Sequence, residues 1–191
     1  MIKRPPSIRL AGEKVVLREK RLSDARDDYA WSTDEELARL DAALPLKLSF
    51  EQASLLYEEE LAYPTGRRQR FGIETPEGEH IGNCMIYDIN ESRGEAELGI
   101  MIGDRRYWGR SYGTDAVRTL LRYVFTQTRL RRVYLHTLDW NVRAQKCFQK
   151  ASFVPTGNVA RNGQTFVAME VWKSQWEKPQ QKARAGVPPM E

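Results

Sequence analysis

The clearest concentration of residues that could do chemistry is the segment ELGIMIGDRRYWGRSYGTDA, residues 97–116. It reads as a β-strand, a basic loop with glycines and the start of a helix. A helix N-terminus presents unpaired backbone N–H groups and the positive end of the helix dipole, so the segment suits a phosphate or pyrophosphate group. Gly109 and Gly113 would let the backbone approach such a group closely. A plain strand-to-helix turn with solvated arginines is the alternative, because the segment is neither a Walker A loop nor a G-x-G-x-x-G fingerprint.

Histidine and cysteine are scarce, which limits other chemistries. The chain has two histidines, His80 and His136, and two cysteines, Cys84 and Cys147, which form no C-x-x-C pair. We therefore expect no metal site and no disulfide, and two free thiols favour a cytoplasmic protein. His80, beside a turn, is expected at the surface, and His136, within a β-prone run, is expected to be a structural sheet residue rather than a base.

Length and composition bound the domain organisation. The 191 residues, of which 41% are hydrophobic and 29% charged, fit one globular domain at 9–175 with flexible tails at 1–8 and 177–191. No apolar run approaches the roughly 18 residues that span a bilayer, so no membrane partner is expected. The net charge of +4 tolerates an anionic ligand, but the arginine clusters lack interleaved aromatic residues. Nucleic acid is therefore not an expected partner, and an RNA-binding accessory protein rests on the charge alone.

The hydrophobic pattern predicts the elements that must position the basic loop. Helices are expected at 23–40 with Ser23 as N-cap, at 49–61, through the apolar face Val117, Leu120, Leu121 and Val124, and from about Asn141 to Ala151. Strands are expected at 15–17, 70–75, 80–89, 95–102 and 133–138, and as two strands around a turn at 161–163. This order predicts an α+β fold, a mixed sheet with helices packed on it.

Two blocks of the sequence resemble the GNAT superfamily of acyl-CoA-dependent N-acyltransferases. The run WGRSYG at 108–113 is similar to the family pattern [R/Q]-x-x-G-x-[G/A], with Ser111 in place of a common glycine. The run at 141–153 is similar to N-x-x-A-x-x-x-Y-x-K-x-G-F, with Phe148 in place of Tyr and Ser152 in place of Gly. The likeness extends over about residues 9–175 and is nearest to the ribosomal-protein N-terminal acetyltransferase-like (RimJ/RimL-like) branch.

The resemblance implies a GNAT fold with a central mixed, mostly antiparallel sheet flanked by about four helices. It also implies acetyl-CoA as co-substrate, without a metal. The implied binding residues belong to the pyrophosphate loop, to the strand along which the pantetheine arm lies, and to the far side of the cofactor: Trp108, Gly109, Arg110, Ser111, Tyr112, Gly113 and Thr114; Met101, Ile102 and Gly103; Asn141 and Lys146. A backbone N–H near Met101 would polarise the thioester carbonyl.

The acceptor amine must be uncharged to attack the thioester. At pH 7 a lysine-like amine of pKa about 10.4 is neutral in roughly one molecule in a few thousand, and an α-amine of pKa about 8 in roughly a tenth. Glu97 lies eleven residues before Trp108, the spacing of the base glutamate in histone-acetylating members of the superfamily. It is the expected catalytic residue, acting through a water, and an ion-paired strand residue is the equal alternative. Phe148 cannot donate a proton to the leaving thiolate, and Cys147, expected in the core, is a poor substitute.

The expected reaction is transfer of an acetyl group to a primary amine, on a protein N-terminus or a small molecule, by direct attack in a ternary complex. Acidic residues before the first long strand would favour a cationic acceptor: Asp27, Asp28, Asp34, Glu35, Glu36 and Asp41. Trp31, among them, is expected in the core. Two alternatives stay open: a polyamine or antibiotic acetyltransferase of the same fold, and a catalytically silent acyl-CoA-binding module. Homodimers are frequent among such enzymes, but no residue pattern here demonstrates one.

Overall fold

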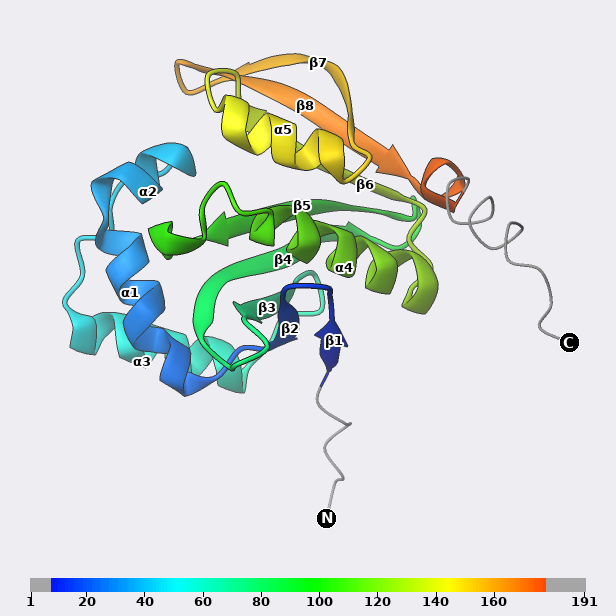
Figure 1. Ribbon diagram of the computed structural model, residues 1–191. Coiled ribbons are helices and arrows are strands. Elements are labelled where there is room, and N and C mark those ends of the chain that lie inside the picture. Colours follow the sequence, from blue (N-terminus) through cyan, green and yellow to red (C-terminus); the bar gives the residue numbers. More distant parts are fainter. Residues whose placement is uncertain (1–7, 178–191) are drawn as a thin grey trace, which may run out of the picture.

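The computed structural model describes residues 8–177, which form one eight-stranded sheet in the order β1-β2-β3-β4-β5-β6-β8-β7 (Figure 1). The strands are β1 (Arg9–Ala11), β2 (Val16–Glu19), β3 (Gln69–Glu74), β4 (His80–Asn90), β5 (Glu95–Ile102), β6 (Arg132–Leu138), β7 (Val154–Arg161) and β8 (Gln164–Trp172). Within this range β5 and β6 are parallel and the other neighbouring strands are antiparallel. The expected mixed, mostly antiparallel sheet is therefore confirmed. Apart from their inner ends, Ile8 and Glu177, the expected tails lie outside the described residues.

The helices are α1 (Ala25–Thr33), α2 (Glu35–Leu40), α3 (Phe50–Ala62), α4 (Tyr112–Gln127) and α5 (Val142–Lys150), with 3₁₀ turns η1 (Leu22–Asp24) and η2 (Arg105–Tyr107). In Figure 1, α4 and α5 lie side by side along one face of the sheet, and α1, α2 and α3 gather to its left. Helix α4 is the crossover that a parallel pair of strands requires between β5 and β6. No helix within residues 8–177 combines the length and the apolar character needed to traverse a bilayer.

The core lies between α4 and the sheet. Val117, Leu120, Leu121 and Val124 are 0% exposed, which confirms the apolar helix face expected from their spacing. They belong to one cluster with buried strand residues such as Phe71 of β3. This packing holds the N-terminus of α4 in a fixed position at the end of β5.

The N-terminal region departs from the expected elements. The single helix expected at 23–40 is wrong, because Asp34 has an extended backbone (φ −76°, ψ 120°) and starts a new helix by accepting a hydrogen bond from the Leu37 N–H at 2.9 Å. Ser23 is not an N-cap, since it lies inside η1 and Asp24 precedes α1. Strand β1, which pairs with β2, was not expected. The remaining elements begin within two residues of their expected positions.

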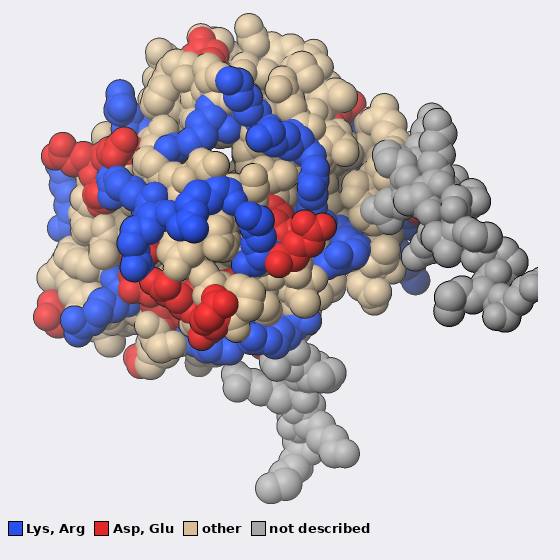
Figure 2. All heavy atoms as spheres, in the orientation of Figure 1, with Lys and Arg blue, Asp and Glu red and all other residues tan. Residues whose placement is uncertain are grey.

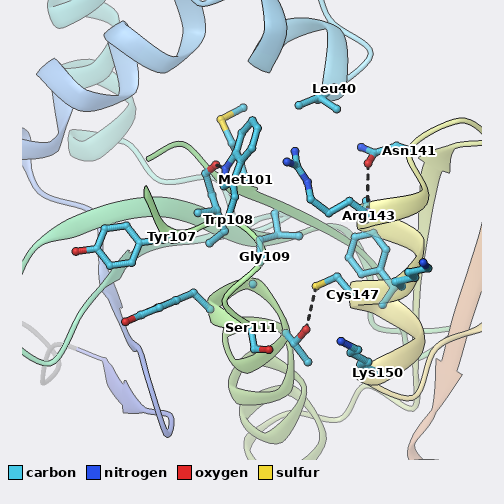
Figure 3. Close-up of a pocket in the computed structure, with 18 of the residues that line it drawn as sticks. Leu40, Met101, Tyr107, Trp108, Gly109, Ser111, Asn141, Arg143, Cys147 and Lys150 are labelled. Carbon is cyan, nitrogen blue, oxygen red and sulfur yellow. Dashed lines mark hydrogen bonds between the residues drawn. The ribbon is translucent and has the colours of Figure 1, made fainter. Parts of the chain in front are cut away.

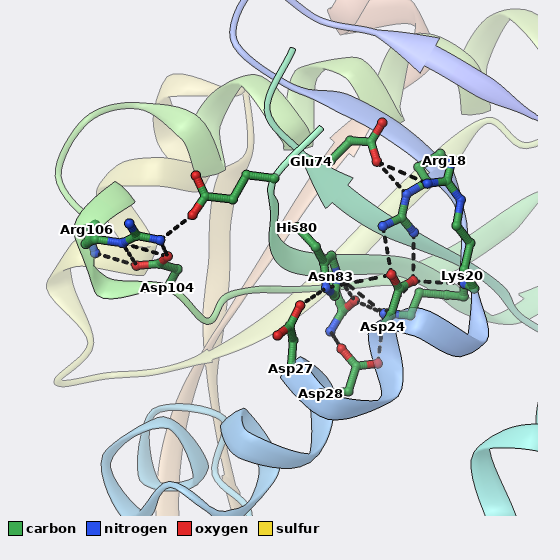
Figure 4. Close-up of polar contacts among 12 residues, drawn as sticks. Arg18, Lys20, Asp24, Asp27, Asp28, Glu74, His80, Asn83, Asp104 and Arg106 are labelled. Atoms are coloured by element: carbon green, nitrogen blue, oxygen red, sulfur yellow. Dashed lines mark hydrogen bonds and ion pairs between the residues drawn. The ribbon is translucent and has the colours of Figure 1, made fainter. Parts of the chain in front are cut away.

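A buried ionic network ties β2 to β3 and to the start of α1 (Figure 4). The Arg18 guanidinium lies 2.7 Å from a carboxylate oxygen of Asp24 and 2.7 Å from one of Glu74, and all three residues are buried. Burial is the largest single influence and raises the pKa of both carboxyls. Arg18 together with the Arg21 backbone N–H outweighs it at Asp24, and Arg18 together with Arg9 outweighs it at Glu74, so the pKa of each carboxyl is lowered. The charges of this buried network therefore balance one another within the protein.

Candidate functional site

Strand β5 stops pairing with its parallel neighbour, β6, well before β5 itself ends. The pairing of β5 with β6 ends at Glu97, opposite Tyr134. Beyond that point β5 pairs with β4 alone and β6 with β8 alone, among the residues described here. The two strands therefore splay, and the β6-facing edge of β5 from Leu98 to Ile102 keeps backbone groups that are free to bind a ligand.

The direction of the backbone decides which groups face this gap. The Met101 carbonyl points toward β4, since a Cβ built on Gly82 would lie 2.2 Å from its oxygen. Successive residues of a strand direct their N–H and C=O groups to opposite sides, so those of Ile100 and Ile102 face the gap. The thioester-polarising donor expected near Met101 is thus better assigned to a neighbour of Met101, because the Met101 N–H is directed at β4.

The basic loop places the N-terminus of α4 at the open end of the gap. The first intrahelical bond of α4 runs from the Asp115 N–H to the Ser111 carbonyl, so the N–H groups of the three residues between them have no partner within the helix. Ser111 adopts the left-handed conformation at φ 69°, and Gly109 does so at φ 70°. The sequence comparison with the family pattern had placed Ser111 where glycine is common, and the positive φ explains that preference.

Replacing Ser111 by Gly is expected to stabilise the protein. A left-handed conformation costs a non-glycine residue about 1 kcal/mol, so Ser111→Gly should raise the melting temperature by roughly 2–4 °C. Ser152→Gly should act similarly, because Ser152, the other position where the family pattern has glycine, has φ 75°. Thermal unfolding followed by circular dichroism measures both, and a fall in melting temperature for both variants would contradict the interpretation.

The loop, the free edge of β5 and α5 line a cavity of about 470 Å³ (Figure 3). Ten of the expected cofactor-binding residues line it: Met101, Ile102, Trp108, Gly109, Ser111, Tyr112, Gly113, Thr114, Asn141 and Lys146. Gly103 and Arg110 do not. Gly103 lies against Trp31, where a Cβ would be 2.1 Å from the indole ring. Arg110 is exposed, and its guanidinium donates to the Arg106 carbonyl at 3.3 Å.

The same cavity has lining residues that were not anticipated from the sequence. Helix α2 contributes Leu37 and Leu40, the residue that ends this helix is Asp41, and α5 contributes Arg143 and Lys150. Helix α2 precedes the basic loop by some 70 residues, and no local pattern indicates that it folds back over the gap. Figure 2 shows Lys and Arg side chains gathered around a hollow on this face, which favours an anionic ligand.

Trp108 bridges the two sides of this cavity. Its indole Nε1–H donates to the Ile102 carbonyl at 2.6 Å. The Arg143 guanidinium lies over its ring, 3.6 Å from the centroid. The Trp108 side chain thus occupies the Ile102 carbonyl on the free edge of β5 and also contacts Arg143 of α5.

A second cavity of about 440 Å³ lies between the sheet and helices α1 and α3. Its walls come from β3, β4 and β5 and from the segment between α2 and α3, which contributes Leu46 and Leu48. Asp41, Ile100 and Met101 line both cavities, so the two meet at the free part of β5. Trp31 lines this second cavity and is half-buried, which corrects its expected place in the core.

Glu97 lies on β5, on the face that Gly99 and Met101 present to the second cavity, because alternate residues of a strand share a face. It lines neither cavity. His136 Nδ1 lies 2.8 Å from a Glu97 carboxylate oxygen, and His136 Nε2 lies 3.3 Å from the Arg161 guanidinium. Since arginine can only donate, His136 carries its proton on Nδ1 and donates it to Glu97. Glu97, the expected base, and His136, expected to be a structural sheet residue, are therefore joined in one hydrogen-bonded chain.

Several other expectations are corrected. Cys147 lines the first cavity, 3.5 Å from the Thr114 hydroxyl, rather than the core, and burial raises the pKa of its thiol. Phe148 is buried beside it and packs on Phe153. The His80 side chain is only 8% exposed, pairs with Asp27 at 3.0 Å and stacks on Trp31, so it is not a surface residue. Within residues 8–177 no three His, Cys, Asp or Glu side chains are grouped as metal ligands.

Splayed parallel strands, a helix N-terminus at the mouth of the gap and a second cavity on the other side of the strand together define the acyl-CoA-dependent N-acyltransferase class. The chain belongs to the Acetyltransferase (GNAT) domain family, whose model matches residues 14–154. It is therefore an N-acetyltransferase that acts on an amine.

Comparison with individual proteins agrees with this family. The chain is 27% identical over 146 residues to the uncharacterized N-acetyltransferase p20 of Bacillus licheniformis, across 76% of this chain and 82% of that protein. It is 27% identical over 180 residues to human alpha/beta-tubulin-N-acetyltransferase 9, across 87% of this chain and 86% of that protein. The solved structure of spermidine N-acetyltransferase from Vibrio cholerae in complex with CoA and spermine superposes with a TM-score of 0.75 at 22% identity, over 85% of this chain and 97% of that one. This last likeness shows the shared fold.

Proposed function

We propose that this chain transfers an acetyl group from acetyl-CoA to a primary amine, with direct attack of the amine while both substrates are bound. The observation that carries this proposal is the meeting of two cavities at Asp41, Ile100 and Met101, beside the free edge of β5. One cavity can hold the acyl donor and the other the amine. Holding both at this junction replaces a bimolecular encounter by a positioned one.

The residues of the first cavity fit acetyl-CoA, which would supply the thioester. The free N–H groups at the start of α4 would hold the pyrophosphate, as the positive φ of Ser111 and Gly109 turns the loop around that position. Lys146 and Asn141 lie across the cavity, although the Asn141 side chain also caps α5 by accepting from the Ala144 N–H. The N–H and C=O of Ile100 and the N–H of Ile102 would hold the pantetheine arm, and one of these N–H groups would polarise the thioester carbonyl.

Glu97 remains the proposed general base, acting through a water. Its support is its position on the strand face shared with Gly99 and Met101, and the hydrogen bond from His136 that fixes its carboxylate. Phe148 stands where a tyrosine could protonate the leaving thiolate. A thiol has a pKa near 8.5, so the thiolate can leave without a protein acid.

The acceptor class is a further part of the proposal. The names of similar proteins include a spermidine acetyltransferase and a tubulin acetyltransferase, so both a small amine and an amine on a protein are candidates, and a protein N-terminus stays a proposal from the sequence resemblance. Cys84 and Cys147 are both free thiols, in keeping with a cytoplasmic site of action. A homodimer also stays a proposal.

A matched pair of variants tests the acetyl-CoA site. Asp and Asn both tolerate the left-handed conformation of Ser111, but Ser111→Asp puts a negative charge where the pyrophosphate would lie. We expect Ser111→Asp to weaken acetyl-CoA binding about tenfold or more by calorimetric titration, and Ser111→Asn to change it much less. Equal affinities for the two variants would remove the loop from the binding site.

Turnover is tested by thiol release with a panel of amines. Release with one acceptor class supports the enzyme and identifies its substrate. Acetyl-CoA binding without release for any amine would favour the catalytically silent module, for which Phe148 is the sequence sign. Phe148→Tyr would then be the next variant, since it restores the side chain common in the family pattern.

A further inference from the structure

The charged side chains of the second cavity are almost all paired with one another. Lys20 Nζ lies 2.8 Å from an Asp28 carboxylate oxygen, and the Asn83 amide donates to the other oxygen at 2.7 Å. Glu60 pairs with Arg70 and Arg68. Figure 4 shows Lys20, Asp28 and Asn83 as part of the network around Arg18. These carboxylates are therefore satisfied within the protein and offer little to a cationic ligand.

Asp41 is different. Its carboxylate has no hydrogen bond or ion pair with any residue of the range 8–177, although its backbone N–H donates to the last turn of α2. Two basic residues of the neighbouring helices contact aromatic rings instead: the Arg39 guanidinium lies over Trp140, 5.0 Å from the ring centroid, and that of Arg143 lies over Trp108. Asp41 is thus a free carboxylate at the point where the two cavities meet.

The surroundings of Asp41 favour a cationic partner. Asp41 is solvent-exposed and lines both cavities, and the protein atoms packed near its carboxyl raise its pKa to about 6. The other charged side chains in the linings are Lys20, Asp28, Glu60 and Arg70 in the second cavity and Arg143, Lys146 and Lys150 in the first. An ammonium at this junction would give the carboxylate the charged hydrogen-bond partner that the protein itself does not supply, and would favour its charged form.

Beyond Asp41 the lining of the second cavity is mostly apolar. Side chains of helices, loop and strands form these walls: Tyr29, Trp31, Leu46, Leu48, Ala53, Leu56, Phe71, Met85 and Met101. An alkyl or aromatic group would bury surface there. A second ammonium would lose its hydration and find only carboxylates that are already paired.

We propose that Asp41 binds the ammonium group of the acceptor at the junction of the two cavities, and that the preferred acceptor is a primary amine with one positive charge on an apolar body. This rests on the proposed function and narrows its acceptor class. Asp41 holds the reacting nitrogen beside the free edge of β5, and Glu97 remains the proposed proton acceptor. Polyamines are then poorer acceptors than a monoamine with a carbon chain of similar length.

The first measurement compares hexylamine with 1,6-diaminohexane, which has the same six-carbon chain, and with spermidine, a longer triamine. We expect kcat/KM for hexylamine to equal or exceed that for 1,6-diaminohexane, since the second ammonium gains no free carboxylate. A kcat/KM about tenfold higher or more for 1,6-diaminohexane or spermidine than for hexylamine would overturn the proposed acceptor class.

The second measurement compares Asp41→Asn with Glu35→Gln, which removes one carboxylate charge from the other end of α2, outside both cavities. Asp41→Asn is expected to raise KM for hexylamine about 10- to 100-fold and to leave KM for acetyl-CoA nearly unchanged, because a charge-assisted hydrogen bond contributes about 1.5–3 kcal/mol. Glu35→Gln should change neither value. An unchanged amine KM in Asp41→Asn would overturn the assignment.

Calorimetric titration with hexylamine separates this inference from the proposed function. If the wild-type protein binds hexylamine and Asp41→Asn does not, Asp41 is the ammonium site even when no thiol is released, and the failure belongs to the proposed function. If both proteins bind hexylamine equally, the inference fails whatever the turnover.

Discussion

Glu97→Gln is expected to lower kcat by about 10²–10⁴-fold and to leave acetyl-CoA affinity unchanged. Glutamine keeps the size of the side chain and can still accept the hydrogen bond from His136 Nδ1, 2.8 Å away. It cannot accept the proton that an ammonium must lose before it attacks the thioester. The defect should shrink as the pH approaches the pKa of the amine, because solvent then supplies the neutral form.

Glu95→Gln is the matched control for this variant. Glu95 lies two residues earlier on β5, on the same face, and pairs with Arg132 at 2.7 Å, away from the gap. We expect Glu95→Gln to retain wild-type kcat within a few-fold, since a partly exposed ion pair contributes little. If Glu97→Gln and Glu95→Gln behave alike, with full turnover, Glu97 serves only as a partner of His136.

Arg18→Met is expected to produce the largest loss of stability. Methionine keeps the apolar part of the side chain but leaves the carboxylates of Asp24 and Glu74 buried without their main cation. Breaking a buried ion pair in this way costs about 3–5 kcal/mol, which corresponds to a fall in melting temperature of roughly 6–20 °C for a chain of this size. Urea unfolding gives the free energy of unfolding directly.

Arg21→Met is the control for Arg18→Met. The Arg21 guanidinium lies 3.7 Å from Glu74, but its side chain is 55% exposed. Its removal is expected to cost less than about 1 kcal/mol. Equal losses for the two variants would mean that burial does not determine the strength of this network.

The same network predicts the effect of pH on stability. The folded protein lowers the pKa of Asp24 and Glu74, so the stabilisation is fully present above their unfolded pKa values, near 4, and is lost as the pH falls through the lower folded values. In Arg18→Met only the weaker partners remain, Lys20 near Asp24 and Arg9 beside Glu74, so the carboxyls should protonate at higher pH than in the wild-type protein. The acid limb of the stability curve should therefore shift upward in pH.

The sequence alone determined the parts of this protein that depend on local pattern. Apolar residues at helical spacing placed α4, Asn141 marked the start of α5, and the run WGRSYG identified the loop between β5 and α4. The replacement of the family's common glycine by Ser111 is also visible in the sequence, and the structure adds that this residue has a positive φ angle. Ten of the twelve expected cofactor-binding residues line the cavity because the loop, β5 and the start of α5 each carry a local signal.

Only the tertiary structure decided the features that join distant segments. Helix α2 folds over the gap, which places Asp41 beside Met101 although they lie 60 residues apart. The strand direction, not the residue types, turns the Met101 N–H toward β4 and leaves its neighbours free. His136 and Glu97 come from two strands whose pairing register no local pattern specifies. The sequence also could not show which charges are paired, because the pairing of Asp28 with Lys20 and of Glu60 with Arg70 depends on three-dimensional contacts. These contacts leave Asp41 as the unpaired carboxylate in the lining of the second cavity.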